Sequence, residues 1–197
     1  MRGNATEDTE FARLVVLACH DLRTPLATVR GFTQTLVRLV QLEEPASRYL
    51  DMIDTASGQI GDLIDELSLG ARIEAGRYEP VREEVDTFEL ARAAAEALGP
   101  ERVDAGGEGT AVEVDAEATK RAVTALARCA LRHGGLEQVK LSADGPRLEL
   151  RPVTAGAAPV LLGEDLRDLG AAVAVRQLRA QGGSVELDGE RLILALT

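Results

Sequence analysis

The sequence contains no tryptophan, and aromatic residues make up only 3% of its 197 residues. A folded core therefore has to be built mainly from Leu, Val, Ala and Ile. Cysteine is also scarce, and the two present are Cys19 and Cys129. Since their positions show no metal-ligand spacing, we expect two reduced thiols and no bound metal.

Positive charge is scarce as well. The chain has 22 Lys and Arg residues against 33 Asp and Glu residues, which gives a formal net charge of −11. Because nucleic acids bind clustered cations, this balance excludes a nucleic-acid partner. The sequence has no apolar run long enough to cross a bilayer, and its polar first residues lack the apolar core of a signal peptide. We therefore expect a cytoplasmic protein without membrane insertion, unless the sequence is cut from a membrane receptor.

The first part of the chain is predicted to be a polar tail over residues 1–8, followed by two helices within residues 9–76. The first helix is expected to end near Gln41, and Ser47 is the expected N-cap of the second. In both helices the apolar residues recur in alternating steps of four and three, which is heptad spacing. The apolar positions are Phe11, Val15, Ala18, Leu22, Pro25, Val29, Phe32 and Leu36 in the first helix, and Tyr49, Ile53, Ala56, Ile60, Leu63 and Leu67 in the second.

Two such helices joined by a short turn form an antiparallel hairpin. One hairpin cannot bury two heptad seams by itself, so we expect a homodimer whose two hairpins form a four-helix bundle. Pro25 removes a backbone hydrogen bond inside the first helix and predicts a kink near Asp21 and Leu22. The sequence leaves open whether this bend is functional or only tolerated.

The second part, residues 81–197, has a different pattern. Short alternating strands and two hairpins are predicted at 111–114, 139–151 and 184–196, with loops at Gly99-Pro100 and Gly106-Gly107. Helices are predicted at 89–98, from the N-cap Asp115 to about Arg132, and at 165–181. The fold class is therefore α+β: a helical hairpin followed by an α/β sandwich, in which one mixed sheet carries helices on one face.

His20 has the surroundings of a reactive side chain. Residues 19–26 read Cys-His-Asp-Leu-Arg-Thr-Pro-Leu. At about 100° per residue, His20 lies opposite the apolar stripe of its helix, and Thr24 lies one turn further along the same face. An exposed imidazole on a rigid helix with an acid beside it favours reversible chemistry over packing.

The block from Ala18 to Phe32 closely resembles the phospho-acceptor motif of two-component histidine kinases. Further resemblance lies at 69–76, 115–133 and 168–183. The order of parts is similar to a histidine kinase core, in which a dimerisation and phospho-acceptor hairpin precedes an ATP-binding domain of the Bergerat type.

This resemblance implies roles for the residues around His20, which would carry a phosphoryl group. Asp21 would fix the imidazole tautomer, and Thr24 would orient water for dephosphorylation of a partner. The alternative for Asp21 and Thr24 is ordinary surface solvation. The expected docking face for a partner consists of Val16, Leu17, Arg23, Ala27 and Gly31, and Arg23 could also neutralise phosphate charge.

The departures from the family lie where ATP would bind. Cys129 stands at the position of the asparagine that holds Mg²⁺, and a thiol is a poor ligand for this hard cation. The adenine-binding Asp and the glycine-rich nucleotide lid are missing after Leu150. Asp168 places a carboxylate where phosphates would lie. His133 is expected to be a helix-end cation and not a ligand.

We therefore expect a dimeric histidine phosphotransferase that carries phosphoryl on His20 between the aspartates of response-regulator receiver domains. Neither ATP nor any other cofactor is expected on this chain, and Mg²⁺ would come from the receiver domain. Two alternatives stay open: an ATP-dependent histidine kinase with a divergent nucleotide site, and a non-catalytic dimeric scaffold that binds a response regulator.

Overall fold

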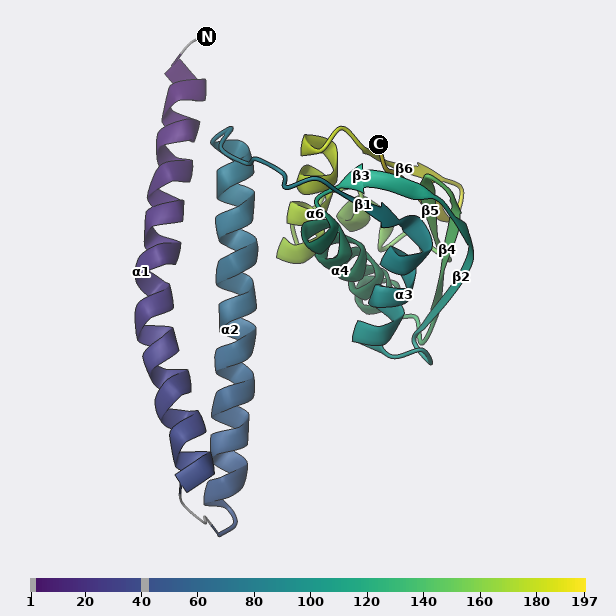
Figure 1. Cartoon of the computed structure of the whole chain (residues 1–197). Coiled ribbons are helices and arrows are strands. Elements are labelled where there is room, and N and C mark those ends of the chain that lie inside the picture. Colours follow the sequence, from purple (N-terminus) through teal and green to yellow (C-terminus); the bar gives the residue numbers. More distant parts are fainter. Residues whose placement is uncertain (1–2, 40–42) are drawn as a thin grey trace. The chain divides into compact units, whose positions relative to one another are not determined.

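The computed structural model describes residues 3–39 and 43–197, and the chain divides into two compact units, Met1–Arg77 and Tyr78–Thr197 (Figure 1). The first unit is helical, and the second combines helices with strands. None of the helices in the described residues is both long and apolar enough to span a membrane.

The first unit is an antiparallel pair of helices, α1 (Gly3–Leu39) and α2 (Ala46–Glu74), which lie side by side (Figure 1). The polar tail expected at residues 1–8 is wrong for residues 3–8, because α1 already begins at Gly3 and the sequence has no helix breaker between Gly3 and Phe11. The end expected near Gln41 lies outside the described residues. Helix α1 runs unbroken through Pro25.

Helix α2 begins at Ala46, two residues earlier than an N-cap at Ser47 would give. Pro45 stands at the N-cap position, no side chain caps the helix, and the Tyr49 N–H donates to the Pro45 carbonyl at 3.1 Å. Ser47 is therefore inside the first turn and is not the N-cap. Proline is well suited to this end of a helix, because its missing N–H has no intrahelical partner there.

The contact between α1 and α2 uses a second heptad series, not the stripe read from the sequence. Most of the buried residues of the two helices are separated by multiples of seven positions: Ala12, Cys19 and Thr33 on α1, and Ser57, Ile64 and Ala71 on α2. Ser68 and Gly70 of α2 are buried beside this series. The predicted stripe instead faces outward on both helices. Its large exposed members are Phe11, Leu22, Val29, Phe32 and Leu36 on α1, and Tyr49, Ile53, Ile60, Leu63 and Leu67 on α2.

The second unit is built on a five-stranded sheet with the order β2-β4-β5-β7-β6. Only the β2–β4 pair is parallel, so the sheet is mixed as predicted. Figure 1 shows α3, α4 and α6 covering one face of this sheet. The strands are β2 (Val103–Gly109), β4 (Val139–Gly145), β5 (Arg147–Arg151), β6 (Ser184–Asp188) and β7 (Arg191–Ala195), and the helices are α3 (Thr87–Leu98), α4 (Ala116–Gly134) and α6 (Leu169–Ala180).

Two further features were not predicted. A separate two-stranded sheet joins β1 (Glu83–Asp86) to β3 (Ala111–Val114), and a short helix, α5 (Ala158–Leu161), lies between β5 and α6. Helix α6 accordingly begins at Leu169, later than the predicted residue 165. The predicted short loop after β5 is therefore a longer connection that contains a helical turn.

Three aspartates cap the longer helices of this unit, α3, α4 and α6. Asp86, Asp115 and Asp168 each accept a hydrogen bond from a backbone N–H in the first turn of α3, α4 and α6, at 2.7–3.0 Å. Asp115 was the predicted cap of α4, and this prediction is confirmed. Such caps satisfy N–H groups that have no partner inside the helix. They also fix the first turns of α4 and α6, and so position the carboxylate of Asp168.

Candidate functional site

His20 is presented to solvent by the packing of its neighbour. Cys19 is 1% exposed in the α1–α2 contact, which fixes the rotation of α1 about its axis. The next residue is turned by about 100° on a helix, so His20 points away from the contact. Its side chain is 76% exposed, and its Nδ1 lies 3.3 Å from Oδ1 of Asp21.

This geometry distinguishes the two ring nitrogens of His20. In the tautomer with hydrogen on Nδ1, that N–H donates to the Asp21 carboxylate. The lone pair of Nε2 is then left facing solvent, where it can act as a nucleophile. Thr24 is exposed one turn further along, and its carbonyl accepts a hydrogen bond from the Thr28 hydroxyl at 3.1 Å.

Arg23 is already engaged within the hairpin. Its Nε and Nη2 donate to Oδ1 of Asp65 on α2 at 3.1 and 2.7 Å. A role at a phosphate or a partner would require Arg23 to leave this carboxylate. An exposed ion pair of this kind contributes little to stability, so the exchange is energetically accessible. Sequence reasoning did not find Asp65, because nothing in the local pattern joins residues 42 positions apart.

The other predicted docking residues lie on the surface of α1. Leu17, Ala27 and Gly31 are exposed, and Val16 is half-buried. A Cβ added at Gly31 would meet no described atom within 4 Å, so the absence of a side chain leaves room for a neighbouring molecule. This face therefore combines two apolar side chains with two small residues next to the imidazole.

In the second unit, the structure brings together Cys129, His133 and Asp168. Cys129 and His133 are one turn apart on α4, and Asp168 is the N-cap of α6. His133 Nε2 lies 3.2 Å from Asp168 Oδ2. The prediction that His133 is only a helix-end cation missed this partner. The four-residue spacing of Cys129 and His133 was visible in the sequence, but the fold alone adds Asp168.

Cys129 is a neutral thiol in this setting. It is fully buried, and burial, followed by the negative charge of Asp168, raises its pKa to about 12. A thiol that keeps its proton at neutral pH is neither a nucleophile nor an oxygen-like ligand for a hard cation.

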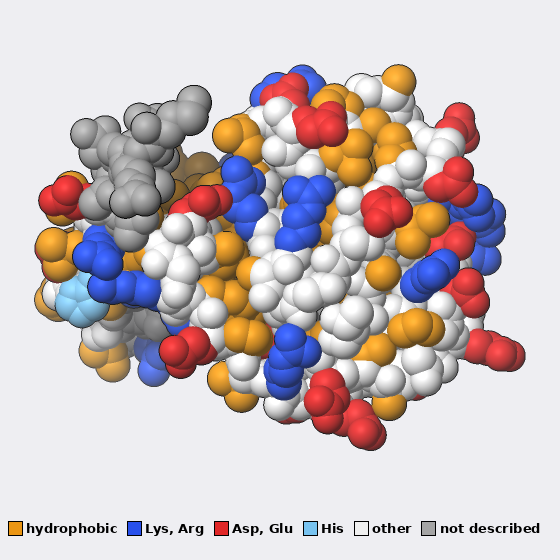
Figure 2. Space-filling view, turned by 90° about the horizontal axis from the view of Figure 1, so that it is seen from above, with side chains coloured by type: hydrophobic (Ala, Val, Ile, Leu, Met, Phe, Trp, Pro, Cys, Tyr) orange, Lys and Arg blue, Asp and Glu red, His pale blue; other side chains and the backbone are white. Residues whose placement is uncertain are grey.

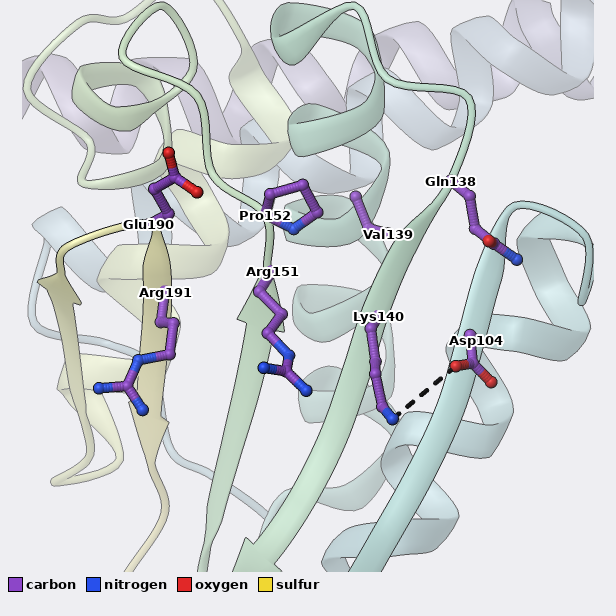
Figure 3. A pocket seen from close by; sticks show the side chains of 8 residues that line it. All are labelled: Asp104, Gln138, Val139, Lys140, Arg151, Pro152, Glu190 and Arg191. Carbon is purple, nitrogen blue, oxygen red and sulfur yellow. Dashed lines mark ion pairs between the residues drawn. The ribbon is translucent and has the colours of Figure 1, made fainter.

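A hollow of about 450 Å³ lies elsewhere, on the face of the sheet away from the helices (Figure 3). Lys140, Arg151 and Arg191 project into it from the adjacent strands β4, β5 and β7. Asp104 faces Lys140 at 4.0 Å, so part of this positive charge is balanced locally. Figure 2 shows the same interspersion of acidic and basic side chains over the face that it displays. No pattern in the sequence indicates this hollow, since it depends on strand register.

Comparison with known proteins finds similarity for both units of the chain. Residues 13–76 match the HisKA family, the His Kinase A (phospho-acceptor) domain. The chain is 33% identical over 172 residues to Histidine protein kinase DivJ of Caulobacter vibrioides, which covers 81% of this chain and 28% of that protein. It spans less than a third of the length of the curated relatives it matches.

Two solved structures share the fold across both units. One is full-length ShkA in complex with AMPPNP, with a TM-score of 0.68 and 20% identity over 94% of this chain and 46% of that chain. The other is the Acinetobacter baumannii histidine kinase AdeS, with a TM-score of 0.54 and 18% identity over 89% of this chain and 94% of that one. The chain therefore contains a two-component histidine kinase core, in which a HisKA phospho-acceptor domain precedes an α/β domain with the fold of a histidine kinase ATPase domain.

Proposed function

We propose that this chain is a dimeric histidine phosphotransferase of a two-component relay. His20 takes a phosphoryl group from the aspartate of one receiver domain and passes it to the aspartate of another. The observation that carries this proposal is the exposed imidazole of His20 with Nδ1 against Asp21, which leaves Nε2 accessible to a macromolecular donor.

The transfer needs no co-reactant beyond the two proteins and the Mg²⁺ of the receiver. The Nε2 lone pair of His20 attacks the phosphorus of the aspartyl phosphate, so an N–P bond forms as the P–O bond to the carboxyl group breaks. The receiver aspartate leaves as a carboxylate. The imidazolium keeps its Nδ1 proton, which Asp21 stabilises. The reverse steps deliver the phosphoryl group to the second receiver.

The residues of the second unit do not fit a Mg²⁺–nucleotide complex. Buried, neutral Cys129 offers no oxygen ligand to Mg²⁺. At the first turn of α6, the Ala171 N–H is taken by Asp168 Oδ1 at 3.0 Å, so a donor that could bind phosphate is already occupied by a carboxylate. The proposed relay therefore takes its phosphoryl group from a receiver domain and not from ATP.

The outward apolar stripe supports a homodimer. Phe32 is 69% exposed and Leu63 is 51% exposed within a single hairpin, and both continue a heptad series. Contact with the same stripe of a second copy would bury these side chains in a four-helix bundle. The expected cytoplasmic location belongs to the same proposal, because receiver domains are found there.

The proposal is tested by incubating the full chain with a ³²P-labelled receiver domain and following label on the chain, in the absence and presence of unlabelled ATP. We expect transfer that does not depend on ATP and that His20→Ala abolishes. Thr35→Ala, an exposed threonine on the same helix, is the matched control and retains transfer. Equal labelling of His20→Ala and the wild-type chain would exclude phosphotransfer through His20 and favour a scaffold.

A second candidate is an ATP-dependent histidine kinase. It is favoured by the kinase named among the relatives and by the fold shared with AdeS and ShkA. Incubation with γ-³²P-ATP alone separates the two candidates, because only a kinase labels His20 without a receiver domain. Thr24 could add phosphatase activity to either candidate by orienting water.

A further inference from the structure

We propose that Cys129, His133 and Asp168 form a binding site for one divalent transition metal ion, and that Zn²⁺ fits these ligands best. The cysteine sulfur, an imidazole nitrogen and a carboxylate oxygen all lie within 4.8 Å of one another. They come from two helices that pack together, since two ligands lie on α4 and the third starts α6. This site is independent of His20 and of the proposed phosphotransfer.

The ligand types select the metal. Zn²⁺ binds cysteine thiolate, histidine nitrogen and carboxylate oxygen, and often leaves one coordination position open to water. A thiolate and a carboxylate together neutralise its two positive charges. Mg²⁺ and Ca²⁺ prefer sites built only from oxygen ligands, so neither suits Cys129.

The geometry requires only a small adjustment. Tetrahedral Zn²⁺ with these ligands holds its donor atoms about 3.4–3.6 Å apart. His133 Nε2 and Asp168 Oδ2 are 3.2 Å apart, close to this separation. The widest pair in the group is no more than 4.8 Å apart, so it must close by at most about 1.3 Å, which rotation of the Cys129 and His133 side chains can supply.

The surroundings hold the carboxylate in position for binding. Asp168 Oδ1 accepts the Ala171 N–H at 3.0 Å, which fixes the carboxylate and directs Oδ2 towards His133. Hydrogen bonds of this kind orient metal ligands and raise affinity. When the ion binds, the neutral imidazole of His133 carries its proton on Nδ1 and gives the Nε2 lone pair to the metal, while the thiol of Cys129 releases its proton to water and binds as the thiolate.

The burial of the three side chains leaves the site accessible from one side. Cys129 is fully buried, whereas the side chains of His133 and Asp168 are 18% and 15% exposed. Water therefore reaches the imidazole and the carboxylate and can fill a fourth coordination position. A bound ion would tie α4 to the start of α6.

The test uses the full chain, stripped with a chelator and then dialysed against Zn²⁺ or Co²⁺ alone. We expect one Zn²⁺ per chain by elemental analysis, and a thiolate-to-cobalt charge-transfer band with Co²⁺. Cys129→Ser should abolish the band, and Asp168→Asn should weaken Zn²⁺ binding at least about tenfold. Because Asn also caps helices well, Asp168→Asn keeps α6 intact and serves as the folded variant if Cys129→Ser does not fold.

Cys19→Ser is the matched control, since Cys19 is equally buried but lies in the other unit. It should keep both the cobalt band and the Zn²⁺ stoichiometry of the wild-type chain. The proposal is overturned if the wild-type chain binds no stoichiometric Zn²⁺, or if Asp168→Asn binds Zn²⁺ as tightly as the wild-type chain does.

Discussion

Asp21 contacts one ring nitrogen of His20, and the proposed reaction depends on that asymmetry. The contact is 3.3 Å long and lies between two exposed side chains, so its contribution to folding is small. Its value lies in selecting the tautomer that frees Nε2 and in stabilising the positive charge that develops on the ring.

We expect Asp21→Asn to slow phosphoryl transfer to His20 by about tenfold or more, since a neutral amide stabilises the imidazolium less than a carboxylate does. Single-turnover transfer from a phosphorylated receiver measures this effect. Thr24→Ala is the comparison on the same helix face, because it should spare transfer and reduce only hydrolysis of the receiver phosphate. Equal transfer rates for Asp21→Asn and the wild-type chain would exclude a role for the carboxylate.

Burial of Cys129 predicts a stability that falls at high pH. The folded-state pKa is raised to about 12, above the value in the unfolded chain, so the unfolded state loses its thiol proton first. The contribution of the protonated Cys129 thiol to the free energy of unfolding is complete below about pH 8.5. At higher pH it declines by about 1.4 kcal/mol per pH unit, until the thiol of the folded chain ionises. Urea unfolding at several alkaline pH values, with a chelator present, should show a shallower decline for Cys129→Ala. Val123→Ala, which shortens another buried side chain of α4, should keep the wild-type slope.

At the scale of elements, β2 shows how tertiary context can override a local signal. The pair Gly106-Gly107 was predicted to be a loop, yet both residues lie in a strand parallel to β4. Gly107 has φ +92°, and a Cβ there would collide with the backbone of Ala143. The glycine is therefore needed for a close approach of two strands, which a sequence pattern cannot distinguish from a turn.

Gly107→Ala should destabilise the second unit by at least about 2 kcal/mol, because the substitution combines an unfavourable φ with a backbone collision. Gly106→Ala is the matched control in the same strand. Its Cβ would meet only the end of the Lys140 side chain at 4.0 Å, so the loss should stay below about 1 kcal/mol. Chemical denaturation of the two variants measures the difference, and equal losses would contradict the packing argument.

Local signals predicted most of the helices and hairpins, since caps such as Asp115 and hairpin turns act within a few residues. The sequence also predicted the position of His20 opposite the apolar stripe. It did not predict the pairs Arg23–Asp65 and His133–Asp168, whose members are 42 and 35 residues apart. Such pairs depend on how elements pack, and one sequence carries no direct signal of that packing.

At the scale of the whole molecule, the helical unit leaves a stripe of large apolar side chains exposed, and the proposed dimer would bury it. Burial of an exposed large apolar side chain contributes about 1.5–3 kcal/mol. Phe32→Glu should therefore weaken the proposed dimer by at least about tenfold and shift sedimentation towards the monomer at micromolar concentration. Ala27→Glu adds the same charge on the exposed face of α1 opposite the stripe and should leave the dimer intact. A wild-type chain that sediments as a monomer at this concentration would exclude the bundle.

Under the proposed relay, the chain receives phosphoryl groups from receiver domains and binds no nucleotide. Titration of the full chain with ATP and Mg²⁺ by calorimetry should give no saturable heat at millimolar nucleotide. The reason is that the buried thiol of Cys129 cannot hold Mg²⁺, while Asp168 occupies the first turn of α6 with a negative charge. Titration with Mg²⁺ alone and with ADP provides the controls for dilution heat and weak anion binding. A micromolar dissociation constant for ATP would contradict this prediction, because it would require a nucleotide site despite both obstacles, and it would favour the ATP-dependent kinase.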